Sequence, residues 1–356
     1  MNTEGLFNPI TLRGVTFRNR IGVSPMCQYS STDGFVNEWH VVHLGSRAVG
    51  GAGVVFVEAT AVVPEGRISP GDTGIWSDKH IEGFAQITRF VSSQGAVPGI
   101  QLAHAGRKAS TPAPWAGKKF LPEGEGGWQT LAPSPLPFAE GFGTPKEMAK
   151  ADIQHVVAGF QEAARRARDA NFRIVEIHAA HGYLLHQFLS PLTNKRSDEY
   201  GGPFDNRIRL VKEVVNAVRS QWPDELPLSV RISASDWAEG GWEIEQSVAL
   251  AKELKPIGVD LIDTSSGGLV PHAKIPVGPL YQVPFAGRIR REAGIATAAV
   301  GLIRHPEEAD GIIKNGDADL VFLAREFLRD PYWPQHAARK LGAAPLHPVQ
   351  YARAAE

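Results

Sequence analysis

One short segment, IHAAHGYLLHQFLSP at residues 177–191, carries three histidines and a tyrosine within nine positions. They are His178, His181, Tyr183 and His186. Imidazole and phenol side chains bind metal ions, transfer protons or donate hydrogen bonds to an anion. The spacing of these four side chains marks the segment as the first candidate for a reaction centre.

A metal site is the weaker interpretation of this segment. The HAAH pair lacks the glutamate of the H-E-x-x-H zinc motif, and no acidic residue lies in the segment, although His104 could supply a third ligand. His186 lies among apolar residues, as a core histidine would. A histidine pair that closes a strand favours donors aimed at a developing oxyanion, with Tyr183 as the proton donor beside them. We therefore predict no bound metal.

The composition is that of an ordinary globular protein. The 356 residues are 43% hydrophobic and 21% charged, with a formal net charge of -1, so we expect neither nucleic acid nor a membrane as a partner. The single cysteine, Cys27, cannot form an internal disulfide, and a reducing compartment such as the cytoplasm is expected. No signal peptide and no apolar run of about 18 residues, the length of a membrane helix, can be recognised.

Eight short runs rich in valine and isoleucine recur along the chain. Each is apolar at nearly consecutive positions and is bounded by glycine, proline or a charge, as parallel strands buried on both faces are. The runs are residues 20–26, 53–60, 97–104, 173–180, 226–233, 259–266, 296–303 and 318–325.

Amphipathic segments of helical length separate these runs. Residues 78–94 and 151–170 carry apolar side chains at helical spacing, and 306–315 is followed by Gly316, a residue typical of helix C-termini. Strands that alternate with helices, without a second compositional regime, predict a single α/β domain over residues 1–356, a (β/α)8 TIM barrel. An open doubly wound sheet is the alternative.

The connection after the third strand is unusually long. Residues 106–145 are dense in proline and glycine but also contain Trp115, Phe120, Trp128 and Phe138. Loops of this length in a compact domain are usually lids, binding loops or disordered segments, and the aromatic residues argue against disorder. We predict a structured lid over the mouth of the barrel.

In a TIM barrel the chemistry lies at the C-terminal ends of the strands. Polar residues gather at these ends, and Gln101, Arg231 and Arg325 each follow or close a predicted strand. We expect these three residues to bind a cofactor whose anionic end rests on the last two strands, where barrels commonly bind phosphate.

Five motifs together resemble the Old Yellow Enzyme family of flavin-dependent ene-reductases, and Cys27, Tyr29 and the short chain point to its thermophilic-like bacterial branch. The likeness runs from about residue 5 to residue 353. It implies a TIM barrel that holds FMN noncovalently, takes electrons from NADPH or NADH, and reduces activated carbon–carbon double bonds of α,β-unsaturated carbonyl and nitro compounds. The motifs are SPMCQYS, VEATAV, GIQLAHAGRK, IHAAHGYLLHQFLSP and NKRSDEYGGPFDNR.

The resemblance also implies which residues bind FMN. The family usually has glycine where this chain has Ala324. The implied contacts are Ser24, Pro25, Met26, Cys27, Ala59 and Gln101 at the isoalloxazine ring, Arg231 near N1 and O2, and Gly301, Ala324 and Arg325 at the phosphate.

The same resemblance implies the catalytic roles. His178 and His181 hydrogen-bond the activating oxygen of the substrate, and Tyr183 protonates Cα after hydride from flavin N5 reaches Cβ. Cys27 tunes the flavin potential and contacts the substrate alongside Tyr29.

The C-terminal tail, residues 345–356, contains a VQYAR segment. In the thermophilic-like branch an arginine in a similar segment enters the active site of the neighbouring subunit. The resemblance therefore implies a homodimer, or a tetramer of such dimers, in which Arg353 lines the partner's substrate pocket.

Two other functions compete with this one. Another FMN-barrel oxidase or dehydrogenase would need a base, whereas the two histidines and Tyr183 look arranged to donate. A non-enzymatic flavin redox sensor would need a resolving thiol, and the chain has only Cys27.

Overall fold

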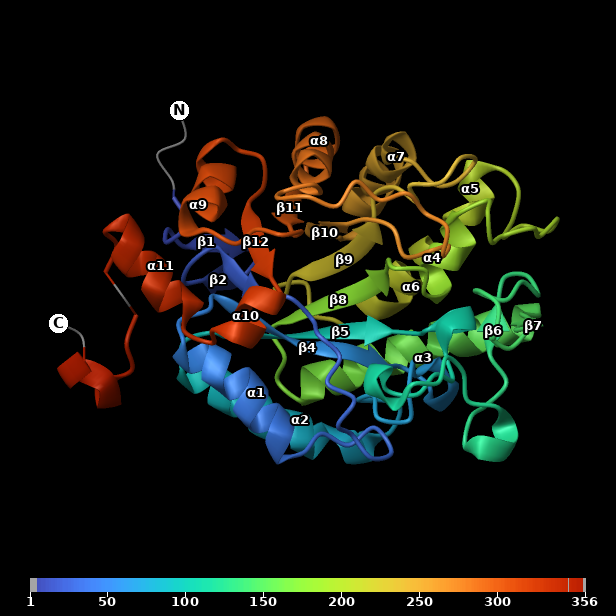
Figure 1. The fold of residues 1–356 in the computed structure, drawn as a ribbon, viewed down its shortest axis with the longest axis horizontal. Helices are drawn as coiled ribbons and strands as arrows, with labels where there is room; N and C mark the ends of the chain where they lie inside the picture. The colour runs from blue at the N-terminus through green and yellow to red at the C-terminus, as the bar shows by residue number, and fades with distance from the viewer. Residues whose placement is uncertain (1–4, 345, 355–356) are drawn as a thin grey trace.

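Eight parallel strands close into a barrel in the order β10-β11-β12-β3-β4-β5-β8-β9 (Figure 1). The structure is a computed structural model that describes residues 5–344 and 346–354. The predicted (β/α)8 barrel is thereby confirmed, and an open sheet is excluded. The barrel strands are β3 (Ile21–Val23), β4 (Val54–Ala61), β5 (Val97–Ala103), β8 (Ile174–Ala179), β9 (Leu228–Ser233), β10 (Leu261–Ser265), β11 (Ala296–Ala299) and β12 (Leu320–Leu323).

Helices cover the outside of the barrel (Figure 1). The longer ones are α1 (Glu38–Val49), α2 (Ile81–Ser93), α3 (Lys150–Asp169), α6 (Arg209–Arg219), α7 (Ile244–Leu254), α8 (Val283–Ala293), α9 (Pro306–Lys314) and α11 (Trp333–Leu341). The short ones are α4 (Leu184–Leu189), α5 (Phe204–Arg207) and α10 (Arg325–Arg329). Two small sheets lie outside the barrel, β1 (Ile10–Leu12) with β2 (Val15–Phe17) and β6 (Leu131–Ala132) with β7 (Lys146–Glu147).

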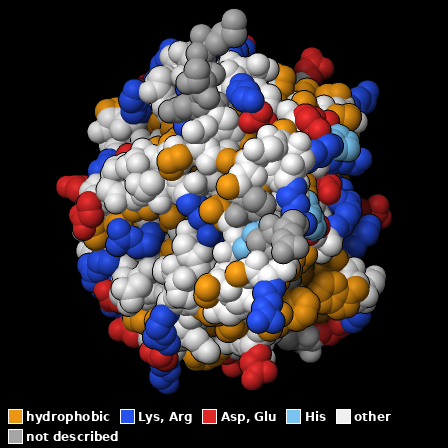
Figure 2. Space-filling model, turned by 90° about the vertical axis from the view of Figure 1, so that its left-hand side faces the viewer, with side chains coloured by type: hydrophobic (Ala, Val, Ile, Leu, Met, Phe, Trp, Pro, Cys, Tyr) orange, Lys and Arg blue, Asp and Glu red, His pale blue; other side chains and the backbone are white. Residues whose placement is uncertain are grey.

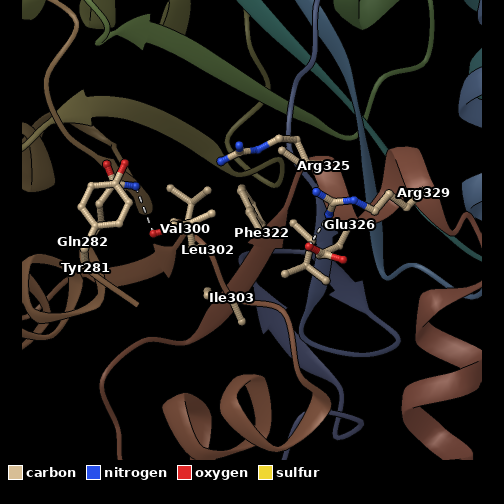
Figure 3. A pocket seen from close by; sticks show the side chains of 12 residues that line it. Tyr281, Gln282, Val300, Leu302, Ile303, Phe322, Arg325, Glu326 and Arg329 are labelled. Atoms are coloured by element: carbon tan, nitrogen blue, oxygen red, sulfur yellow. Dashed lines mark hydrogen bonds and ion pairs between the residues drawn. The ribbon is translucent and has the colours of Figure 1, made fainter. Parts of the chain in front are cut away.

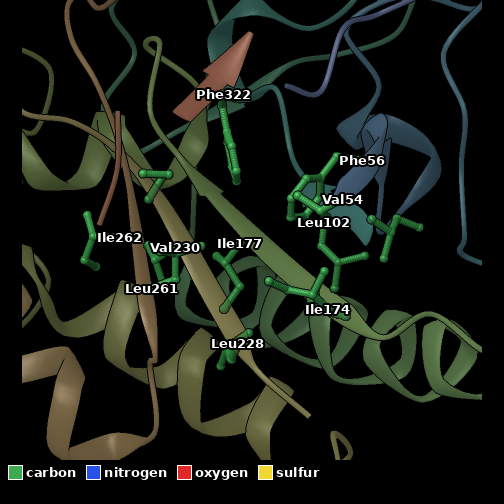
Figure 4. Close-up of a cluster of buried hydrophobic side chains, with 14 of the residues drawn as sticks. Val54, Phe56, Leu102, Ile174, Ile177, Leu228, Val230, Leu261, Ile262 and Phe322 are labelled. Carbon is green, nitrogen blue, oxygen red and sulfur yellow. The ribbon is translucent and has the colours of Figure 1, made fainter. Parts of the chain in front are cut away.

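The amphipathic pattern explains how the helices pack. In α3, Ile153, Val156 and Phe160 are fully buried and fall on one face. The helix begins where Asp152 accepts a hydrogen bond from the N–H of Ala149, 2.8 Å away, which satisfies one of the free donors of the first turn. The apolar runs of the strands form the core, part of which is drawn in Figure 4.

Two phenylalanines on neighbouring parts of the barrel pack against each other inside this core. The rings of Phe56 and Phe322 lie 5.6 Å apart between centroids. Their strand partners are Gly99 and Gly22, and a Cβ on either glycine would collide with the ring beside it. Glycine is required at these two positions because large aromatic side chains bend over the neighbouring backbone.

The segment of residues 106–145 has little regular structure but is tied to the barrel. It contains η3 (Gly106–Lys108), η4 (Pro114–Ala116), η5 (Glu123–Glu125) and one strand of the β6–β7 sheet. The indole of Trp128 donates to the carbonyl of Glu65, 2.9 Å away, and Arg107 donates to the carbonyl of Leu269. That the segment acts as a lid stays a prediction.

The loop that carries the candidate residues is anchored by a buried hydrogen bond between a histidine and a carboxylate. His186 accepts the N–H of Gly182 at Nδ1, so its Nε2 carries the proton and donates to Asp236, 2.8 Å away. Asp236 also accepts from Ser190 and from the N–H of Trp242. Burial acts to raise the pKa of Asp236, but its contacts with His186 outweigh this and leave the pKa below its usual value. His186 is therefore a core histidine, as predicted.

The described part of the C-terminal tail lies at the side of the barrel opposite the strand C-termini. Helix η7 (Val349–Ala354) follows α11, and the arrows of β8 and β9 point away from it (Figure 1). Residues 345 and 355–356 of the predicted tail, and residues 1–4 of the predicted domain, lie outside the described residues.

The described residues give no sign of a membrane-spanning helix. Within residues 5–344 and 346–354, no helix is long and apolar enough to cross a bilayer. On the face shown in Figure 2, Lys and Arg side chains are interspersed with Asp and Glu, so no field of one sign covers it.

Candidate active site

A charged network crosses the interior of the barrel. The Nε atom of Arg231 on β9 lies 3.1 Å from a carboxylate oxygen of Asp263 on β10. Its Nη1 donates to the hydroxyl of Ser24, 3.0 Å away, directly after β3. Because β3 and β9 stand on opposite sides of the barrel, this contact spans the lumen. The Nε atom of Arg231 has no well-aligned hydrogen-bond acceptor despite its burial.

A second carboxyl group lies in the same network. Glu176 on β8 accepts hydrogen bonds from the amide of Gln101, at 2.8 Å, and from the hydroxyl of Ser229, at 3.0 Å. Burial and then the charge of Asp263 raise the pKa of Glu176 to about 8. Burial raises the pKa of Asp263 to about 6, against the opposing charge of Arg231. Two acids beside one cation therefore hold a proton near neutral pH.

The two histidines of the HAAH pair lie at the mouth, above Arg231. His178 pairs in register with Arg231, and its Nδ1 accepts the N–H of Ala180 at 3.3 Å. Nε2 of His178 therefore carries the proton. The rings of His178 and His181 lie 5.2 Å apart between centroids, at 84°. Burial and then the charge of Arg231 lower the pKa of both histidines well below the usual value, so both are neutral.

The tautomer of His181 depends on a hydroxyl of β10. The Oγ of Ser265 lies 2.7 Å from Nε2 of His181 and 3.3 Å from the amide oxygen of Gln282. That amide oxygen already accepts from Ser266 at 2.6 Å. The amide oxygen can accept two hydrogen bonds, so the Ser265 hydroxyl can donate either to Gln282 or to Nε2 of His181. In the second arrangement the proton of His181 lies on Nδ1.

Tyr183 and Cys27 meet beside the histidines. Both pack against one small apolar cluster to which Ala59 belongs, and the Tyr183 ring lies 5.0 Å from the ring of His178. Burial and then Cys27 raise the pKa of Tyr183 well above its usual value. Burial and then Asp72 raise the pKa of Cys27, so the thiol is protonated. Tyr29 contacts the ring of Trp115 at 5.7 Å.

A pocket opens at the ends of β11 and β12 (Figure 3). Gly301 has a φ of 116°, which only glycine adopts readily, and a Cβ there would lie 2.6 Å from the amide nitrogen of Gln282. Ala324 has a φ of -111°, so its backbone does not require glycine. The side chain of Arg325 reaches across the pocket, whereas Arg329 turns to pair with Glu326 (Figure 3).

These features fit a flavin mononucleotide. The lumen presents an amide, a guanidinium with an unaligned N–H and a hydroxyl, which suit the polar edge of the isoalloxazine ring. The pocket with Arg325 suits a dianionic phosphate. The individual contacts of these residues with FMN stay predictions.

The structure brings most predicted site residues together and leaves one apart. The lumen and mouth of the barrel contain five of the predicted residues, Ser24, Gln101, Arg231, His178 and His181. The turn after β3 adds Pro25 and Met26 beside them. Arg353 lies on the exposed η7, beyond the opposite end of the barrel. His104 is buried with Nδ1 bonded to the N–H of Gly106. Among the described residues no group of three or more His, Cys, Asp or Glu side chains could hold a metal ion.

Sequence reasoning missed the acids of the lumen. Glu176, Ser229 and Asp263 alternate with apolar residues in IVEIHA, LSVRIS and LIDTS. An alternation of period two places them on one face of each strand. The runs looked uniformly buried, which hid this signal.

The family described as NADH:flavin oxidoreductase / NADH oxidase matches residues 5–343. An NADPH dehydrogenase of Geobacillus sp. (strain WCH70) is 54% identical over 98% of each chain, and one of Bacillus subtilis (strain 168) is 49% identical over 98% of each. The solved structure of an old yellow enzyme homologue from Zymomonas mobilis aligns with a TM-score of 0.81 at 27% identity, covering 96% of this chain and 94% of that one.

The barrel, its polar lumen and its anion pocket define a flavin-dependent oxidoreductase of the TIM-barrel class. The chain belongs to the NADH:flavin oxidoreductase / NADH oxidase family, and the predicted likeness to Old Yellow Enzyme is confirmed. It is an enzyme with FMN as cofactor and a nicotinamide as electron donor, so the redox-sensor alternative is wrong.

The shared proton of the lumen predicts a pH dependence of stability. A raised carboxyl pKa contributes stability that is fully present below the unfolded value of about 4.3 and is lost as pH rises through the folded value. With the pKa of Glu176 at about 8, Glu176→Gln should gain on the order of 5 kcal/mol relative to the wild type as the pH rises from about 4 to about 8. Urea unfolding with saturating FMN measures this.

The control for this experiment is Glu253→Gln, which removes an exposed carboxylate paired with Lys212. Its stability curve should run parallel to that of the wild type. If the Glu176→Gln curve also runs parallel, Glu176 is ionised throughout and the shared proton does not exist.

Proposed function

We propose that the enzyme reduces the carbon–carbon double bond of α,β-unsaturated carbonyl and nitro compounds, with electrons from NADPH or NADH. The observation that carries the proposal is a set of neutral hydrogen donors at the barrel mouth, His178, His181 and Tyr183. The relatives named NADPH dehydrogenase support NADPH as the electron donor. A morphinone reductase solved with tetrahydroNAD aligns with a TM-score of 0.79 at 27% identity, covering 97% of this chain and 93% of that one.

The lumen and the pocket would hold FMN between them. Gln101 and Arg231 meet the polar edge of the ring, and Arg325 with the backbone at Gly301 and Ala324 holds the phosphate. The turn of residues 24–27 and Ala59 line the ring. When bound, FMN supplies two-electron chemistry between the nicotinamide and the alkene. The chain itself supplies orientation, charge and a proton.

The two histidines would polarise the substrate. Nε2 of His178 carries a free proton, and His181 carries one on Nδ1 when its Nε2 accepts from Ser265. In that tautomer both histidines can donate to one carbonyl or nitro oxygen. Hydrogen bonds to that oxygen grow stronger as it gains negative charge, which lowers the barrier to attack at Cβ. The imidazoles can be neutral and still polarise the substrate, because Arg231 already supplies a positive charge beneath them.

Tyr183 would supply the proton to Cα, and Cys27 and Tyr29 would contact the substrate beside it. A phenol whose pKa is raised stays protonated, and it can give its proton only to a strongly basic carbon such as the one formed at Cα. Cys27 is a thiol and not a thiolate, which fits a contact or a tuning role better than nucleophilic attack.

The pKa directions also weigh against an oxidase that abstracts a proton from its substrate. Such an enzyme needs a base near its operating pH. The histidines have lowered pKa values and are poor bases, and Tyr183 is not a phenolate. The two histidines and Tyr183 are all suited to donate a hydrogen bond or a proton to the substrate.

We further propose a homodimer, or a tetramer of dimers, in the cytoplasm. Arg353 is exposed on η7 and lies far from its own barrel mouth. Val349 and Tyr351 are exposed beside it, at 81% and 43%. On α1, Trp39 and Val42 are exposed as well, and the Trp39 indole donates to Gln28, next to Cys27. A second copy that covers these apolar residues would bring its Arg353 towards the substrate pocket.

Replacing Tyr183 separates the two halves of the reaction. Tyr183→Phe should bleach with NADPH at the wild-type rate, because no charge is lost. Reoxidation by 2-cyclohexenone should slow by about 100-fold or more, since general acid catalysis contributes about that much. Anaerobic stopped-flow absorbance of the flavin measures both steps. Slow bleaching with normal reoxidation would assign Tyr183 the opposite role.

Mixing two impaired variants tests the shared site. A protein truncated after residue 349 should have a raised KM for enones and a weakened dimer while it keeps FMN. A mixture of it with Tyr183→Phe should be more active than either parent, because one site then has Tyr183 and a donated Arg353. A monomer in solution, or unchanged kinetics of the truncated protein, would remove the proposal.

A further inference from the structure

Lys108 stands where three loops of the barrel mouth meet. Its Nζ donates to the carbonyl of His181, 2.8 Å away, and to the carbonyl of Gly268, 3.1 Å away. It also lies 5.1 Å from the ring centroid of Tyr183 and 4.7 Å from that of Phe138. The lysine follows β5, the two carbonyls follow β8 and β10, and Phe138 belongs to residues 106–145.

The two loops that Lys108 bridges are packed backbone against backbone. His181 has a φ of 59°, and Gly182 and Gly268 have φ values of 75° and 86°. A Cβ on Gly182 would collide with the carbonyl of Gly268, and one on Gly268 would lie 2.8 Å from Cα of His181. A non-glycine residue at such a φ is held only by its surroundings. The ammonium that binds both carbonyls is one of the contacts that hold it.

The hydrogen bonds of Lys108 do not pair its positive charge with a carboxylate. Both of its hydrogen-bond acceptors are carbonyls, whereas Arg231 faces Asp263. Burial and then Arg107 lower the pKa of Lys108 to about 8, so it is a cation at neutral pH. The titratable groups that face it are Arg107 from its own segment, His178 and His181 from the end of β8, and Tyr183.

We propose that Lys108 is a positioning residue that fixes the turn of His181 and Tyr183 and offsets the negative charge that Tyr183 acquires when it protonates the substrate. The inference rests on the proposed function. The O–H bond of Tyr183 breaks as the C–H bond at Cα forms, while NAD(P)H supplies the two electrons and the second hydrogen. The phenolate left behind regains its proton from water. A cation against the face of the ring favours that phenolate.

The test compares Lys108→Met, which keeps the aliphatic length, with Lys108→Arg, which keeps the charge. Lys274→Met, on an exposed lysine, is the control. In FMN-loaded enzyme, Lys108→Met should slow anaerobic reoxidation by 2-cyclohexenone about tenfold and leave reduction by NADPH unchanged. Lys108→Arg should retain most of the rate. In a Tyr183→Phe background, Lys108→Met should slow reoxidation by clearly less than tenfold, because only its effect on the His181 turn then remains.

A pH profile provides a readout that a merely structural role would not move. The reoxidation rate of the wild type should fall above about pH 8, as the ammonium loses its proton. Lys108→Met should lack this limb, whereas Glu176→Gln, which removes the other group that titrates in this range, should retain it.

Four outcomes overturn the inference. Equal slowing of both half-reactions would make Lys108 a structural residue, and so would full slowing by Lys108→Met in the Tyr183→Phe background. If the reoxidation rate of the wild type does not fall above about pH 8, the charge of Lys108 has no role in the reaction. If Tyr183→Phe itself reoxidises normally, the proposed role of Tyr183 fails first and the inference falls with it.

Discussion

The polar lumen and the active site of this barrel depend on the buried guanidinium of Arg231. A charge inside a barrel is tolerated only with a partner, and removing one partner of such a pair costs about 3–5 kcal/mol. Asp263 provides the opposite charge from the neighbouring strand, and Ser24 provides a hydroxyl from across the lumen. The inward positions of β8, β9 and β10 are polar because they surround this cation.

Arg231 also adds to the effect of burial on the two histidines above it. The pKa values of His178 and His181 fall because of burial and because this cation is close, while burial raises those of Tyr183 and Cys27. All four groups at the mouth are consequently neutral and carry a proton. A site of neutral donors over a fixed cation suits a reaction in which negative charge develops on the substrate. It suits proton abstraction poorly.

The sequence was informative where the signal is local. Apolar runs located all eight strands, and the spacing of His178, His181 and Tyr183 located the mouth. The roles that the sequence did not reveal depend on contacts between residues that are far apart along the chain. Ser265, 84 residues away, hydrogen-bonds Nε2 of His181, and Lys108 contacts carbonyls that are 73 and 160 residues away. Asp263 was hidden for another reason, since a run that is buried on both faces masks the alternation of a polar lumen.

Reduction of an activated alkene by the FMN-loaded enzyme is the central claim, and one cuvette tests it most directly. The purified protein is mixed anaerobically with one equivalent of NADPH and then with 2-cyclohexenone, while the flavin absorbance is followed and the product is analysed by chromatography. The account predicts bleaching, then full recovery of the absorbance without air, with one cyclohexanone formed for each flavin. Bleaching that recovers only when oxygen is admitted, with the enone unchanged, would contradict it.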